Sequence, residues 1–208
     1  MTQSLWAFVG ISLLVIATPG PDTALTVRNT LLGGRRGGGF TAAGVAAGQA
    51  IWALATSVGL VALLVASEPV FEAVKWLGAA YLVWLGAHAL WSAWRGRAAP
   101  GAAVAGSARL SHATAFRQGL LSDLGNPKMA VFFASLLPQF APAGNATFAV
   151  LLGLGLVFCS LTFAWLTLYA CAVSRARRLL GGRIGRTLDA VAGAILVALG
   201  LRLAAEPG

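Results

Sequence analysis

Long apolar runs alternate with short polar segments along the chain. Six runs are long enough to be membrane spans: residues 5–27, 40–65, 70–91, 116–140, 148–173 and 187–205. A helix needs roughly 20 apolar residues to cross the hydrocarbon core of a bilayer. The pattern therefore predicts an all-α integral membrane protein with six transmembrane helices.

Composition supports this fold class. Of the 208 residues, 58% are hydrophobic and only 10% are charged, whereas soluble domains carry about 25% charged residues. The net charge of +9 could suggest nucleic-acid binding. However, the basic residues lie in short loops between apolar runs, so the lipid bilayer is the expected partner and nucleic acid is not.

The loops predict the orientation, because cytoplasmic loops of membrane proteins are enriched in Lys and Arg. The loops after the first, third and fifth runs are basic, and the alternate loops around Ser67 and Gly144 contain no Lys or Arg. We therefore expect the basic loops to be cytoplasmic and both termini to lie outside. The first run lacks a preceding basic residue and a clear cleavage site, so we interpret it as a span and not as a signal peptide.

Two of the predicted spans contain helix-breaking residues near their middles. The first span carries Pro19-Gly20-Pro21, and the fourth carries Asn126-Pro127. Proline suits the first position of a helix, so Pro21 and Pro127 are expected to begin new half-helices. Spans one and four are thus predicted to be broken.

An internal repeat relates the two halves of the chain. The segment 82–86 resembles 196–200 at an offset of 114 residues, and the two proline breaks pair span one with span four. We expect one membrane domain, with a three-helix repeat in 1–94, a cytoplasmic linker in 95–115 and a second repeat in 116–208. Three spans per half make the repeats inverted, an architecture typical of secondary transporters.

The motifs at the breaks resemble those of the lysine exporter (LysE) family, particularly its RhtB branch, named for resistance to homoserine and threonine. The matching segments are 19–22, 34–38, 75–86, 126–128 and 137–140. The resemblance implies a bacterial inner-membrane exporter of amino acids or close derivatives, such as homoserine, threonine, leucine or lysine. It also implies H⁺ antiport driven by the proton motive force, and a homodimer. Asp123 departs from the family, whose members often carry Asn there.

Each break provides groups that suit an amino-acid zwitterion. Half-helices beginning at Pro21 and Pro127 present unpaired N–H groups to a carboxylate. The carbonyls freed before each break, around Pro19 and Gly20 and before Asn126, could receive an ammonium group. The alternative is a simple kink that neighbouring helices tolerate.

Asp22 and Lys128 are the charged candidates beside the breaks. A carboxylate in the bilayer is costly, and Asp22 could exchange a proton for the cargo's ammonium. Alternatively, Asp22 only stabilises the start of its half-helix. Lys128 could bind the cargo's carboxylate or pair with Asp22 or Asp123. Its alternative is an extension to the cytoplasmic surface.

Gln49 and Asp123 complete the predicted site. Gln49 follows the sequence Gly44-x-x-x-Gly48, whose glycines permit close helix approach. It could donate a hydrogen bond across to span one, although packing is its simpler role. Asp123 lies nearer the cytoplasmic mouth, where we expect it to be solvated.

Other classes of function are weaker alternatives. The chain lacks the metal-binding helix motif and the nucleophile elbow of common hydrolases, so we expect no enzyme, no catalytic residue and no cofactor. An exporter of a metal cation or a toxic metabolite is the main alternative. A soft-metal exporter should place several Cys, His or Asp ligands in its spans, and this chain offers chiefly Asp22, so we expect no metal site.

Overall fold

The structure is a computed structural model and describes residues 2–59, 67–94, 110–141 and 147–205. These residues form helices and connecting turns, and none of them forms a β-strand, which confirms the all-α prediction. Most of the predicted linker, at 95–109, lies outside the described residues.

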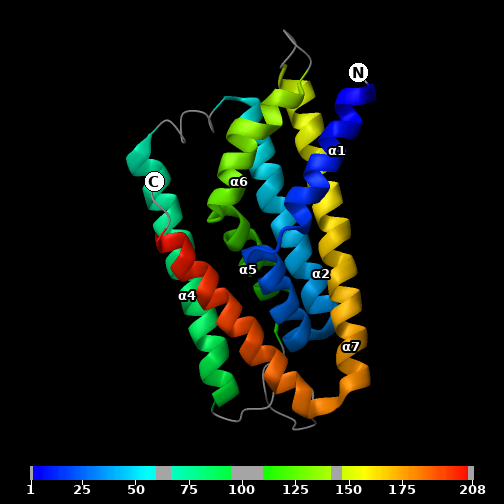
Figure 1. Cartoon of the computed structure of the whole chain (residues 1–208), viewed down its shortest axis with the longest axis vertical. Coiled ribbons are helices and arrows are strands. Elements are labelled where there is room, and N and C mark those ends of the chain that lie inside the picture. The colour runs from blue at the N-terminus through cyan, green and yellow to red at the C-terminus, as the bar shows by residue number, and fades with distance from the viewer. Residues whose placement is uncertain (1, 60–66, 95–109, 142–146, 206–208) are drawn as a thin grey trace.

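The first predicted span is broken as expected. Three residues separate the end of helix α1 (Thr2–Ala17) from the start of α2 (Pro21–Ser57), and the two helix axes meet at an angle of 57°. Figure 1 shows α1 and the start of α2 following one another through the centre of the bundle.

Helix α2 itself reverses direction at Gly34. This residue has φ 66° and ψ −164°, a conformation that glycine adopts without the steric cost of a Cβ. The two legs of α2 then run antiparallel, and the Nδ2 of Asn29 donates a hydrogen bond to the Oγ1 of Thr41 at 2.9 Å. The first leg continues the first predicted span, and the second leg corresponds to the second predicted span (Figure 1).

The fourth predicted span is a chain of short helical pieces: α5 (His112–Leu124), α6 (Pro127–Val131), the π-helix η1 (Phe132–Leu136) and the 3-10 helix η2 (Leu137–Phe140). Helix α5 packs along α2. The irregular turn at η1 leaves the carbonyl of Phe133 to accept a hydrogen bond from Thr56 Oγ1 at 3.2 Å.

The remaining described helices are α4 (Glu68–Trp94) and α7 (Phe148–Ala205). The loop expected between 173 and 187 is helical instead, because α7 continues through it. Figure 1 shows α7 bending at one end of the molecule and returning beside α4. Ala79 of α4 and Leu196 of α7 pack together with Leu25 in a small apolar cluster.

By length and hydropathy alone, one described segment qualifies as a membrane span, namely 148–176 with a mean hydropathy of 2.2. A second qualifies if α1 and α2 are counted as one broken span. The six-span inverted repeat therefore stays a prediction.

Candidate functional site

The two predicted helix breaks are present. Pro21 occupies the start of α2 with Gly20 as its N-cap, and Pro127 occupies the start of α6 with Asn126 as its N-cap. Proline has no N–H to lose at this position and its φ already suits a helix. Both half-helices therefore begin where the sequence predicted.

The two breaks meet at Asp22. Ser122 Oγ donates a hydrogen bond to Asp22 Oδ1 at 2.7 Å, and Asn126 Nδ2 donates one to Asp22 Oδ2 at 3.0 Å. Ser122 lies in the last turn of α5 and Asn126 is the N-cap of α6, so both oxygens of the carboxyl are held by the second break. Residues about 100 positions apart in the chain thus share one polar site.

Asn126 has a second role in the same place. Its Oδ1 accepts a hydrogen bond from the backbone N–H of Lys128 at 3.1 Å, which caps α6. One amide side chain thus uses its oxygen for its own helix and its nitrogen for Asp22. Because both ends of the amide are engaged, its orientation is fixed.

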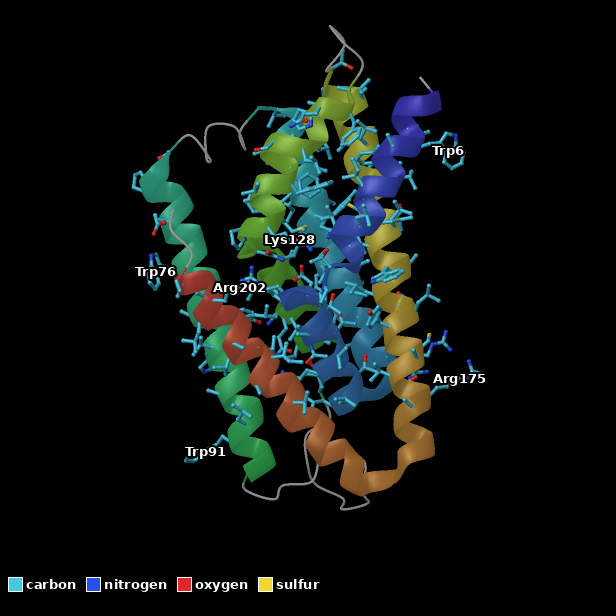
Figure 2. The ribbon with its side chains drawn as sticks, viewed as in Figure 1. Trp6, Trp76, Trp91, Lys128, Arg175 and Arg202 are labelled. Carbon is cyan, nitrogen blue, oxygen red and sulfur yellow. The ribbon has the colours of Figure 1, made fainter. Side chains whose placement is uncertain are left out.

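Lys128 reaches from the second break to the first. Its Nζ donates hydrogen bonds to the carbonyls of Val15 at 2.6 Å and Thr18 at 3.2 Å, at the C-terminal end of α1. These are carbonyls that a helix end leaves without an intrahelical partner, and a cation is favourable there. Figure 2 shows Lys128 at mid-height in the bundle, far from either end.

The structure thus assigns Lys128 a contact that the sequence did not predict. We expected a cargo carboxylate or an acid as its partner, or an extension to the surface, and its ammonium instead lies on backbone carbonyls. The charge still interacts favourably with Asp22. An ammonium has three N–H donors, so one remains for a further acceptor.

A cavity of about 30 Å³ lies between the breaks. Its polar wall is formed by Thr18, Gly20, Asp22, Thr23, Gln49, Asn126, Lys128 and Thr162. Apolar residues including Ile16 and Phe158 form the remaining wall. A cavity needs about 10–15 Å³ to hold one water, so this one has room for about two or three waters and must widen to admit an amino acid.

Gln49 lines this cavity but does not bond to the first span. Its Nε2 donates to the sulfur of Met129 on α6 at 3.7 Å, and thioether sulfur is a weak acceptor. The glycines before Gln49 behave as predicted. A Cβ on Gly44 would collide with the backbone of Phe116, so α2 and α5 touch because glycine is present.

The environment of Asp123 differs from the expected one. The prediction that it is solvated is wrong, because its side chain is 0% exposed. Gly48 lies against its carboxyl, and Trp52 Nε1 donates to its backbone carbonyl at 3.3 Å. Neither carboxyl oxygen has a hydrogen bond of good geometry, although the amide of Gln49 is its polar neighbour.

The structure brings together most of the predicted site residues. Gly20, Asp22, Gln49, Asn126 and Lys128 share the cavity, while Pro21 and Pro127 set the backbone and Pro19 is exposed in the break. The sequence analysis missed Ser122. It expected carbonyls before the first break to receive an ammonium group of the cargo, and the ammonium of Lys128 lies on such carbonyls instead. Ser122 lies four residues before Asn126, and this spacing places two side chains on one side of a helix. The spacing was not used as a signal, because the helix is broken between the two residues.

This arrangement defines a class of protein: an all-helical chain whose polar groups gather between two broken helices. The comparisons with known proteins identify it further. The chain matches the LysE type translocator family over residues 13–206. It therefore belongs to that family of membrane proteins, and it is a transporter rather than an enzyme.

Three relatives align with the chain over nearly their full lengths, and two of them are named as membrane proteins. The chain is 34% identical to the membrane protein PA4757 of Pseudomonas aeruginosa, with 96% of this chain and 94% of the relative aligned. It is 27% identical to the membrane protein YrhP of Bacillus subtilis, with coverages of 96% and 98%. It is 31% identical to the homoserine/homoserine lactone efflux protein of Salmonella typhi, with 98% of each chain aligned. No solved structure matches significantly.

Proposed function

We propose that the protein exports a small amino acid or a close derivative from the cytoplasm in exchange for protons. The observation that carries this proposal is the joint engagement of Asp22 by Ser122 and Asn126 across the two helix breaks, beside a cavity. We propose export as the direction of transport because the chain is similar to an efflux protein.

The cavity offers a matching group for each end of a zwitterion. Asp22 would bind the ammonium of the cargo, because it is a carboxyl on the cavity wall. Lys128 and the N-terminal ends of the half-helices would bind the carboxylate. Gln49 and the backbone at Pro19, Gly20 and Pro127 complete the proposed cargo site.

Proton coupling is proposed for Asp22. A carboxyl can hold either a proton or an ammonium partner, and an unpaired carboxylate is costly in the bilayer. An empty carrier that returns to the cytoplasmic side would therefore take a proton on Asp22. Arrival of the next cargo molecule would displace that proton into the cytoplasm, so one substrate moves outward as a proton moves inward.

The proposed architecture is a six-span inverted repeat in the bacterial inner membrane, with repeats in 1–94 and 116–208, a linker in 95–115 and a homodimeric assembly. Support comes from the pairing of the two breaks. The reversal at Gly34, which Arg35 and Arg36 follow, lies at the same end as the bend of α7 in Figure 1. By the positive-inside rule this end would face the cytoplasm, and both termini would face outward.

The decisive experiment uses purified protein in liposomes that contain a mixture of the standard amino acids and homoserine. A proton gradient is imposed, and mass spectrometry identifies the solutes that leave. We expect gradient-dependent loss of one or a few amino acids. If folded protein releases none of them above empty liposomes, the proposal is wrong, and metal cations and other metabolites are tested next.

A further inference from the structure

Three buried acceptor oxygens on two neighbouring side chains lack a hydrogen bond of good geometry. They are both carboxyl oxygens of Asp123 and the Oε1 of Gln49. Asp123 is 0% exposed and Gln49 is 1% exposed. Water therefore does not reach these oxygens from the surface, and a buried acceptor that lacks a donor costs free energy.

One proton on Asp123 would satisfy most of these unpaired acceptor oxygens. A protonated carboxyl has an O–H donor beside its remaining acceptor oxygen. The amide N–H of Gln49 approaches the carboxyl, and the Oε1 of the same amide is a vacant acceptor, so acid and amide can pair through both groups. A proton on Asp123 removes a buried charge and lets its O–H donate to Gln49 Oε1. Asp22 differs, because Ser122 and Asn126 already supply a donor to each of its oxygens.

The surroundings of Asp123 favour a retained proton over a transported one. Asp22 lines the cavity, whereas the cavity wall does not include Asp123. A Cβ on Gly48 would lie only 2.6 Å from Asp123 Oδ2, so the second leg of α2 covers the carboxyl. The titratable groups facing it in the described part of the chain are Asp22 on the first leg of α2 and Cys159 on α7.

We propose that Asp123 is a neutral acid that orients Gln49 toward the cargo. With Gln49 Oε1 held by the acid, its Nε2 is directed toward the cavity side, where it now contacts only the weak acceptor sulfur of Met129. An oxygen atom of the cargo is a stronger acceptor and would replace that contact. Asp123 is thus a positioning residue, and this role rests on the proposed function.

Infrared spectroscopy tests the protonation directly. A protonated carboxyl absorbs at a higher frequency than amide and carboxylate groups, and the band shifts in D₂O. At neutral pH we expect such a band in Asp22→Asn, where Asp22 cannot contribute to it, and its loss when Asp123→Asn is added to that variant. Absence of the band in Asp22→Asn would mean that Asp123 is ionised and only accepts from the Gln49 amide, which overturns the proposal.

Exchange between liposomes and medium tests the positioning role. The amino-acid mixture with homoserine is placed inside, its isotope-labelled form outside, and the pH is equal on both sides. Asp123→Leu and Gln49→Leu should each slow exchange by about tenfold, the effect of one lost hydrogen bond to a charged group. Asp123→Asn should recover most of the rate, since its amide N–H also donates to Gln49.

Gln139→Leu is the matched control, because this exposed amide only bonds the carbonyl of Ser135 in its own segment. If Asp123→Leu is unfolded, Gln49→Leu and Asp123→Asn carry the test. Wild-type exchange speed in Gln49→Leu, or equal losses in the Asn and Leu variants of Asp123, would overturn the positioning role. Failure of the wild type to exchange any amino acid would instead refute the proposed function, and the infrared band would still decide the protonation.

Discussion

Asn126 Nδ2 lies 3.0 Å from Asp22 Oδ2, and this hydrogen bond joins the two helix breaks. The same amide caps α6 through its oxygen. Asn126 is therefore both a structural cap and a ligand of the central carboxyl, and its replacement should affect the stability and the site together.

Asn126→Ala should lower the free energy of unfolding by about 1–3 kcal/mol, because it removes a helix cap and leaves a partly buried carboxyl oxygen without its donor. Thermal unfolding in detergent measures this loss. Gln139→Ala is the control, since its exposed amide bonds only within its own segment. Unfolding of Asn126→Ala at the wild-type temperature would contradict the assigned bonds.

Ser122→Ala should weaken cargo exchange, because its hydroxyl orients Asp22 at 2.7 Å. A double-mutant cycle with Asp22→Ala, which removes the acceptor, isolates this interaction. We expect a coupling energy of about 1–3 kcal/mol in unfolding measurements, the range for a hydrogen bond to a charged group. Ser160→Ala serves for comparison, because Ser160 is exposed and bonds only the carbonyl of Leu156. Additive effects of the Ser122 and Asp22 variants would argue against the contact.

Lys128→Met tests whether Lys128 binds the carboxylate end of the cargo. Homoserine has a carboxylate, whereas homoserine lactone has an ester in its place but keeps the amino group. If Lys128 binds the carboxylate, the variant should weaken homoserine binding by about tenfold or more and affect the lactone less. Competition with labelled homoserine at neutral pH measures both. Equal losses for the two ligands would indicate that Lys128 acts only by capping α1 at Val15 and Thr18.

Gly44→Ala should destabilise the contact between α2 and α5. A Cβ there would collide with the carbonyl of Phe116, and backbone cannot move aside as a flexible side chain can. We expect a loss of about 1–3 kcal/mol in unfolding free energy. Gly153→Ala is the matched control on α7, because a Cβ at that position would have nothing within 4 Å. An unfolding midpoint for Gly44→Ala equal to that of Gly153→Ala would refute the tight contact.

The sequence predicted the helix breaks because proline acts locally. Pro21 and Pro127 restrict their own φ and lack an N–H, so their positions at the starts of half-helices follow from covalent geometry. The close approach at Gly44 was also predictable, since a small-residue spacing indicates a helix contact. These features depend on residues that are neighbours in the chain.

Other features depend on tertiary contacts and were not predictable from the sequence. The first break predicted free carbonyls, but their partner was not predictable, because the ammonium of Lys128 reaches Val15 and Thr18 from more than 100 residues away in the chain. Asp123 was expected in water because it lies nearer the cytoplasmic mouth than Lys128 does. Its burial comes from Gly48 and Trp52 on a different helix.

The central claim is that cargo and proton compete for Asp22, and Asp22→Asn in liposomes tests it most directly. The variant should still exchange labelled amino acid at equal pH on both sides, because the cavity and Lys128 remain. It should not build a cargo gradient when a pH gradient is imposed, because an amide does not take up a proton in exchange for ammonium. An Asp22→Asn protein that builds the full wild-type gradient would contradict the account.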